Sequence, residues 1–177
     1  MLALLASPAA ARPASSGWFA EGGLGAVTFM PPRASKAAAI GPSIGVRVGY
    51  DLFSFMSLNL HLAASSHEAT VPPPPDKEWF QLYRAAADLR LTGRIDKIAL
   101  FAEGGIGLVM ISSNVLGKKQ ITDPGESFGL MFGAGAGFEY QLENRHYSVG
   151  LSADGFLIPQ FAKISGIDTR AFLRYTY

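Results

Sequence analysis

Hydrophobic and polar residues alternate along most of this chain, so that over long stretches every second position is apolar. Such alternation is typical of β-strands that have one apolar and one polar face. The pattern predicts an all-β fold of eight strands, over residues 17–30, 41–53, 55–66, 79–93, 97–111, 127–142, 146–158 and 166–177.

The connections between the predicted strands alternate in length. Tight turns are expected at residues 51–55, 93–97 and 142–146, and longer loops at residues 30–40, 67–77, 112–127 and 159–165. Short turns at one end and longer loops at the other are typical of an up-and-down antiparallel barrel that spans a membrane.

The composition of the two faces indicates which one is outside. In the sixth predicted strand Leu130, Phe132 and Phe138 share one face, and Gly133 and Glu139 share the other. A face of glycine, serine and single charges suits the narrow interior of a closed eight-stranded barrel, whereas lipid requires an apolar exterior with every backbone group paired. We therefore predict a closed up-and-down transmembrane β-barrel. The alternative is a soluble barrel that turns its apolar face inward around a ligand.

The composition fits this prediction. Hydrophobic residues make up 49% of the 177 residues and charged residues 16%, and the mean hydropathy is +0.21. No apolar run reaches the roughly 18–20 residues that a membrane helix needs. The net charge of +1 argues against nucleic acid as a partner, and the absence of cysteine excludes disulfides and cysteine-based metal sites. We expect no cofactor and no metal site.

The first residues resemble the end of a secretory signal. A short apolar stretch is followed by small residues at Ala9 and Ala11, which fit a cleavage site of the A-x-A kind. We expect residues 1–16 to be a signal-peptide remnant with a disordered N-terminus, and residues 17–177 to form the barrel.

The barrel sequence repeats itself. The stretch Phe-Ala-Glu-Gly-Gly-Leu-Gly-Ala-Val at 19–27 returns as Phe-Ala-Glu-Gly-Gly-Ile-Gly-Leu-Val at 101–109. Two copies of a long unit indicate a barrel built from paired half-domains of four strands each.

Aromatic residues mark the expected membrane boundaries. All six tyrosines lie on the apolar parity. Trp18 and most of the tyrosines fall at the end with the tight turns, and Trp79 and Phe128 fall at the opposite end. Belts of aromatic residues at both interfaces are typical of membrane barrels.

Charged residues of both signs fall on the parity that faces the interior. Buried charges are tolerated only when they are paired and hydrogen-bonded, so we predict a network of salt bridges that fills the lumen. Its expected members are Glu21, Arg47, Arg84, Asp88, Arg90, Glu103, Glu139, Asp154, Arg170 and Arg174, and Asp51, Asp168 and His61 share their parity. Two repeat-related pairs are expected between neighbouring strands, Glu21 with Arg174 and Glu103 with Arg90. The alternative to a filled lumen is a narrow path for ions.

The C-terminal residues carry a family resemblance. Residues 171–177 alternate apolar positions and end in an aromatic residue, and the chain carries the glycine-rich stretches Phe-Ala-Glu-Gly-Gly and Gly133-x-Gly135-x-Gly137-x-Glu139-Tyr140. The chain resembles the transmembrane domain of outer-membrane protein A and its single-domain relatives in Gram-negative bacteria. The resemblance implies a location in the cell outer membrane and contact with its lipid, including lipopolysaccharide. It also implies recognition by the barrel-assembly machinery through Leu173, Tyr175 and Tyr177.

Three functions follow as hypotheses. The first is a structural or interaction scaffold without enzymatic activity that presents loops at the cell surface, where the stiff Pro72–Pro75 segment is a candidate protein contact. The second is a narrow pore for ions or small solutes. The third is a lipid A-modifying enzyme, for which His61, His67 and His146 supply no membrane-facing triad with serine and an acid.

Overall fold

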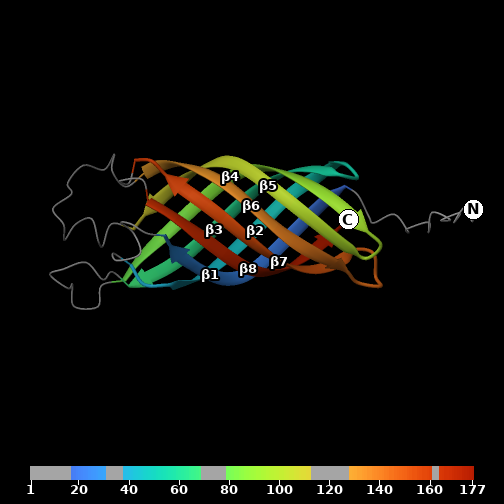
Figure 1. Ribbon diagram of the computed structural model, residues 1–177, viewed down its shortest axis with the longest axis horizontal. Helices are drawn as coiled ribbons and strands as arrows, with labels where there is room; N and C mark the ends of the chain where they lie inside the picture. The colour runs from blue at the N-terminus through green and yellow to red at the C-terminus, as the bar shows by residue number, and fades with distance from the viewer. Residues whose placement is uncertain (1–16, 31–37, 69–78, 113–127, 161–163) are drawn as a thin grey trace, which may run out of the picture.

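The computed structural model describes residues 17–30, 38–68, 79–112, 128–160 and 164–177, and these form a closed barrel of eight antiparallel strands (Figure 1). Each strand pairs with its neighbours in the chain, and the first pairs with the last. This confirms the predicted fold class. The strands are β1 (Trp18–Phe29), β2 (Gly41–Phe53), β3 (Met56–Glu68), β4 (Trp79–Ile95), β5 (Ile98–Ile111), β6 (Phe128–Gln141), β7 (Tyr147–Ile158) and β8 (Ile164–Thr176).

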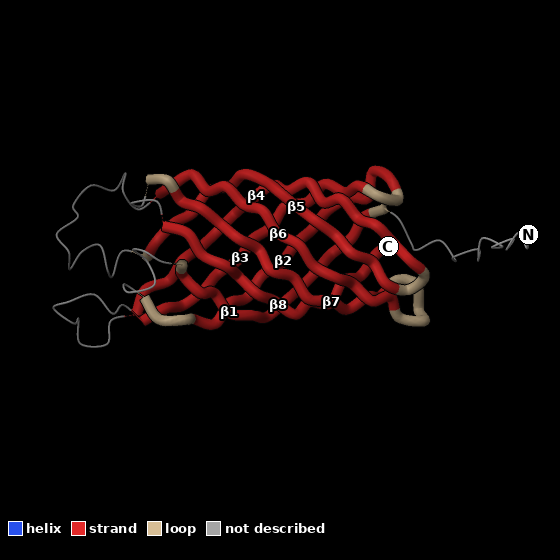
Figure 2. Tube along the Cα trace, in the orientation of Figure 1, coloured by secondary structure: helices blue, strands red, loops and turns tan. Residues whose placement is uncertain are grey.

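The strands are tilted against the barrel axis and account for nearly all of the described chain (Figure 2). Residues 54–55, 96–97 and 142–146 connect strands at one end, which we call the short-turn end, and β1 starts and β8 finishes there. The opposite end is the long-loop end. No helix within the described residues is long and apolar enough to cross a membrane.

Strands β3 and β4 extend two residues further than expected, because their ladder continues to the pair Glu68 and Trp79 at one end and β4 pairs with β5 as far as Ile95 and Ile98 at the other. The connection at residues 96–97 is correspondingly tight. Asp96 has a φ of 53°, a left-handed conformation that aspartate tolerates in hairpin turns of this length.

Burial alternates along the strands in the sense opposite to that of a soluble protein. In β2 the side chain of Val46 is 51% exposed and that of Arg47 is 2% exposed. Leucine, valine and aromatic side chains cover the outside, and charged, serine and glycine residues line the inside. The alternative of a soluble barrel with an apolar interior is therefore wrong.

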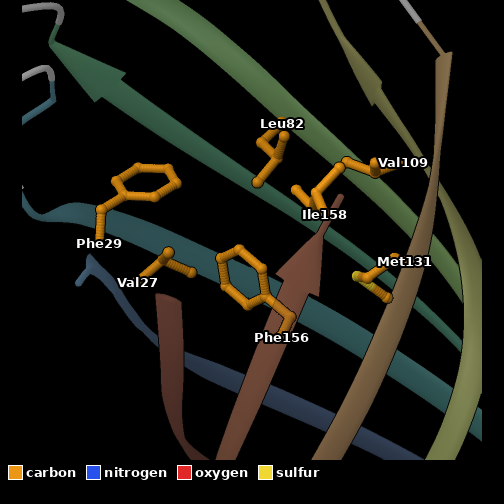
Figure 3. Packing of buried hydrophobic residues seen from close by; sticks show 7 residues of the cluster. All are labelled: Val27, Phe29, Leu82, Val109, Met131, Phe156 and Ile158. Atoms are coloured by element: carbon orange, nitrogen blue, oxygen red, sulfur yellow. The ribbon is translucent and has the colours of Figure 1, made fainter. Parts of the chain in front are cut away.

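The interior of the long-loop end holds a cluster of buried apolar side chains (Figure 3). Its members come from β1, β4, β5, β6 and β7, and they are Val27, Phe29, Leu82, Val109, Met131, Phe156 and Ile158. The rings of Phe29 and Phe156 meet edge to face at 6.2 Å, a geometry that aromatic pairs favour. We call these seven residues the apolar plug.

Glycines on the inner face make room for phenylalanine rings. A Cβ atom at Gly137 would lie 2.4 Å from Cζ of Phe101, and one at Gly150 would lie 2.4 Å from Cζ of Phe172. Gly49 stands in the same relation to Phe19. Each ring therefore rests directly on the backbone of the neighbouring strand, at its paired residue, which explains why glycine occupies these inner positions.

Two expectations concern parts of the chain outside the described residues. These are the signal-peptide remnant at residues 1–16 and the contact segment Pro72–Pro75, and both stay predictions.

Candidate functional site: the charged lumen

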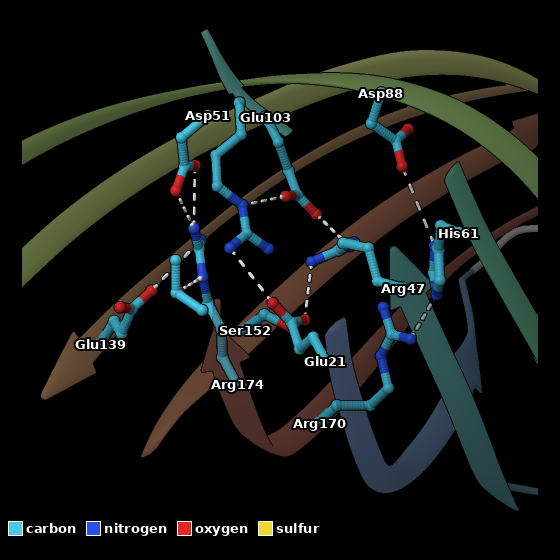
Figure 4. A network of polar contacts seen from close by, with 12 residues as sticks. Glu21, Arg47, Asp51, His61, Asp88, Glu103, Glu139, Ser152, Arg170 and Arg174 are labelled. Atoms are coloured by element: carbon cyan, nitrogen blue, oxygen red, sulfur yellow. Dashed lines mark hydrogen bonds and ion pairs between the residues drawn. The ribbon is translucent and has the colours of Figure 1, made fainter. Parts of the chain in front are cut away.

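The middle of the lumen holds the charged residues that the sequence pattern placed inside. Strands of the whole barrel contribute to this layer, which lies between the apolar plug and the short-turn end (Figure 4). The side chain of Arg90 is fully buried and that of Arg47 is nearly so. Guanidinium groups at this depth need compensation by carboxylates, and the contacts fall into three groups.

The first group is a closed ring of two glutamates and two arginines, which we call the tetrad. Arg47 donates to Glu21 at 2.9 Å and to Glu103 at 2.5 Å. Arg90 donates to the second oxygen of each glutamate, at 3.2 Å to Glu21 and 2.8 Å to Glu103. Each carboxylate thus bridges both guanidinium groups, and the ring ties β1, β2, β4 and β5 together across the lumen.

The second group lies between the tetrad and the apolar plug. Asp168, fully buried, accepts hydrogen bonds from Arg84 and from the Ser43 hydroxyl and lies 3.6 Å from Arg170. Arg170 also donates to Asp154 at 2.5 Å. A 3.9 Å contact between Arg47 and Asp154 joins this group to the tetrad.

His61 belongs to the second group as a neutral acceptor. Arg170 contacts its Nε2 atom, and arginine can only donate, so Nε2 carries the lone pair and Nδ1 carries the hydrogen. That Nδ1 atom faces the carboxylate of Asp88 at 4.0 Å. His61 therefore links a guanidinium to a carboxylate that has no arginine partner within 4 Å in the described chain.

The third group lies toward the short-turn end. Arg174 donates to both carboxylate oxygens of Asp51 at 2.8 Å, and it lies 3.7 Å from Glu139. Arg94 contacts Glu139 at 3.5 Å from the other side. Arg94 has the same inward parity as Arg90. The sequence pattern placed it in the turn at residues 93–97, so it was not among the predicted members of the network.

Of the two predicted ion pairs related by the sequence repeat, the described part of the structure contains one. The strand register is as expected, since Glu21 faces Arg174 and Arg90 faces Glu103 across neighbouring strands. Arg90 and Glu103 form an ion pair. The expected ion pair between Glu21 and Arg174 is wrong, because within the described residues Arg47 and Arg90 take both oxygens of Glu21 and Arg174 extends toward Asp51.

The repeat reappears in the packing of these arginines on aromatic rings. Arg90 lies over the ring of Phe101 at 4.1 Å, and Arg174 lies over the ring of Phe19 at 3.8 Å. Both distances are within the range of favourable cation–π contacts. Phe19 and Phe101 are equivalent positions of the sequence repeat.

A small cavity lies within the charged layer. A cavity of about 30 Å³ lies among His61, Asp88, Glu103 and Asp154, enough for one or two water molecules. The side-chain amide of Asn59 and one oxygen of Asp154 have no hydrogen-bond partner, which is consistent with water in this layer. The described residues contain no group of acids and histidines arranged to hold a metal ion.

The residues of the expected assembly signal lie on the outer face at the short-turn end. Leu173 and Tyr177 are exposed, and the ring of Tyr175 lies 4.9 Å from those of both Tyr147 and Tyr177. Trp18 and Tyr50 form a further aromatic pair at this end, at 5.3 Å. These contacts form the aromatic belt expected there, and recognition of the C-terminus by assembly machinery stays a prediction.

Comparison with known proteins agrees with this architecture. A family model described as outer membrane protein beta-barrel domain matches residues 1–172. No curated protein sequence matches the chain.

Solved structures resemble the barrel in fold at low sequence identity. Neisserial surface protein A is 14% identical with a TM-score of 0.64, and the match covers 92% of this chain and 99% of that one. The outer membrane protein OprG from Pseudomonas aeruginosa is 11% identical with a TM-score of 0.65, covering 93% and 98%. The attachment invasion locus protein Ail of Yersinia pestis is 11% identical with a TM-score of 0.51, covering 92% and 97%.

Proposed function

The chain belongs to the outer membrane protein β-barrel family, and from this premise we propose that it is a non-conducting scaffold that presents its long loops at the cell surface. The protein resides in the outer membrane of a Gram-negative cell, where its apolar exterior contacts lipid.

The observation that carries the proposal is that two barriers follow each other along the lumen. The tetrad crosses the middle of the barrel with four ion pairs, and the apolar plug fills the long-loop end. Apolar constrictions stop ions because water leaves them. The ion pairs and the packed plug make the barrel rigid. A rigid barrel holds its loops in a defined orientation toward whatever they bind.

A narrow ion path is the second candidate. The cavity beside Asp88 and Asp154 and the unpartnered amide of Asn59 favour it, because they indicate some water in the charged layer. For this path to conduct, the apolar plug would have to open.

Enzymatic activity toward membrane lipid is not part of the proposal. Ser65 and His67 form a serine–histidine hydrogen bond of 2.9 Å. Both side chains are buried inside the barrel, and the ring of His67 lies against Phe29 and Phe80. His67 also binds the carbonyl oxygen of Ala39 at 3.1 Å. This arrangement holds the chain next to β2 in place and offers no surface to a lipid.

Single-channel recording in planar bilayers tests the proposal. We expect no conductance steps from the wild-type protein. Phe29→Ala combined with Phe156→Ala should admit water to the plug without touching the tetrad, and Leu157→Ala, a neighbouring position on the outer face, is the matched control. Folding is verified by heat-modifiable migration on gels. Regular conductance steps from the wild-type barrel would contradict the non-conducting scaffold and favour the ion path.

A further inference from the structure

The outer surface of β2–β6 carries an apolar groove toward the long-loop end. Its volume is about 510 Å³, within the range of about 300–1,000 Å³ typical of small-molecule sites. The groove lies on the outside of the barrel, and the inward-facing residues Arg84 and Val109 also contribute to its lining.

The strand registers explain why the surface is hollowed here. One row of outward side chains crosses the strands as Ile44, Ala64, Tyr83, Met110 and Phe128. The next row toward the short-turn end crosses them as Val46, Leu62, Ala85 and Leu108. Each row thus contains one alanine flanked by two large side chains.

The two alanines form the floor of the groove. Ala64 lies between Ile44 and Tyr83, and Ala85 lies between Leu62 and Leu108. The two alanines are on neighbouring strands and in successive rows, so their short side chains leave one continuous depression. The larger neighbours form its walls.

A polar row borders the groove on the long-loop side. Ser66 faces Gln81 across β3 and β4, and the Gln81 backbone N–H donates to the Ser112 hydroxyl at 3.0 Å. The Tyr83 hydroxyl, at the edge of the groove, donates to the Gln81 side-chain oxygen at 3.1 Å. The boundary between apolar and polar outward residues therefore coincides with the end of the groove, which is where a membrane interface is expected.

We propose that this groove is a binding site for one acyl chain of a membrane lipid, with the ester or amide group of the lipid at the Gln81–Tyr83 edge. The groove is continuous with the lipid-facing surface of the barrel and is lined by apolar side chains, so a hydrocarbon chain matches it along its length. The polar row supplies hydrogen-bonding groups at the level where the chain of a lipid meets its headgroup.

Photocrosslinking in vesicles tests the site directly. The protein is reconstituted in phosphatidylcholine vesicles in which a small, varied fraction of the lipid carries a diazirine midway along one acyl chain. Peptides that acquire lipid are then identified by mass spectrometry. We expect labelling of Tyr83 and Leu108 to saturate as the fraction of probe rises, whereas labelling of Leu151, on the far side of the barrel, should rise in proportion.

Three variants complete the test. Ala85→Leu places a larger side chain on the floor, where it takes the space of part of the bound chain and removes packing contacts that favour binding inside lipid, so saturable labelling should be strongly reduced. Ala136→Leu, an outward alanine on β6 away from the groove, should leave it unchanged. Gln81→Leu tests the polar edge and should shift labelling toward the long-loop end. Proportional labelling everywhere, or equal labelling of Ala85→Leu and wild type, would overturn the proposal.

Discussion

At the residue scale, the lumen is held by contacts that each depend on a single side chain. The tetrad is closed because every carboxylate oxygen and both guanidinium groups take part. Replacing one partner of a buried ion pair leaves an uncompensated charge, which is more damaging than removing both partners.

The tetrad leads to a quantitative prediction. Glu21→Ala and Arg47→Ala should each lower the free energy of unfolding by about 3–5 kcal/mol, and the double change should recover part of that loss because the pair is in direct contact. Urea unfolding from lipid vesicles measures the three values. The matched comparison is Glu21→Ala with Arg84→Ala, whose ion pairs belong to different groups and whose losses should add more closely. Equal coupling energies for the pair Glu21 and Arg47 and for the pair Glu21 and Arg84 would contradict the tetrad.

The inner glycines lead to a second prediction at this scale. Gly137→Ala places a Cβ 2.4 Å from the ring of Phe101 and 2.4 Å from the carbonyl oxygen of Leu151, so it should destabilise the barrel by about 1–3 kcal/mol through overpacking. Gly104→Ala is the control, because its nearest neighbour would be 3.6 Å away on the open outer face. The two unfolding midpoints in urea are compared, and a Gly104→Ala variant as unstable as Gly137→Ala would refute the packing argument.

At the element scale, β8 both closes the barrel and carries the C-terminal aromatic pattern. It pairs with β1 from Phe19 to Phe29 and with β7 from Tyr147 to Ile158. An unpaired strand edge cannot exist in lipid, so insertion depends on this strand arriving in the correct register. Outward Leu173, Tyr175 and Tyr177 alternate with inward Arg174 and Thr176.

This alternation predicts different effects of two neighbouring substitutions. Tyr177→Ser removes an exposed aromatic residue of the expected assembly signal and should sharply reduce the amount of folded protein in the outer membrane. Thr176→Ser, on the inner face, should leave that amount near the wild-type level. Quantification of heat-modifiable protein in membrane fractions measures both amounts. Similar levels for the two variants would show that the terminal aromatic residue is not part of the assembly signal.

At the scale of the whole molecule, the barrel has two unlike ends. The short-turn end carries the aromatic contacts of Trp18, Tyr50, Tyr147 and Tyr175, and the long-loop end holds the apolar plug. In barrels of this kind the short turns face the periplasm and the longer loops face the outside.

The orientation can be tested because the native chain has no cysteine. A single cysteine at Lys118 should react with a membrane-impermeant maleimide in intact cells, whereas one at Asn144, in the connection at residues 142–146, should react only after the outer membrane is permeabilised. Labelling of the Asn144 variant in intact cells would reverse the orientation and with it the proposed presentation of the long loops.

The sequence alone determined the barrel, its strands and its two faces. Period-two alternation assigns every residue of a strand to one side, and a closed eight-stranded lumen admits only small or paired polar side chains, so the inside could be identified without coordinates. The register that places Glu21 beside Arg174 also followed, since the tight turns and the strand lengths leave few alternatives.

Only the tertiary structure decided which charges meet, where the lumen closes and where the outer surface is hollowed. Long arginine side chains reach across a narrow lumen to several carboxylates, so the partners of Glu21 do not follow from strand register alone. The apolar plug combines residues from five strands, and the groove floor combines Ala64 of β3 with Ala85 of β4. Such combinations depend on how the strands are staggered around the barrel, and the alternation within a single strand carries no information about that stagger.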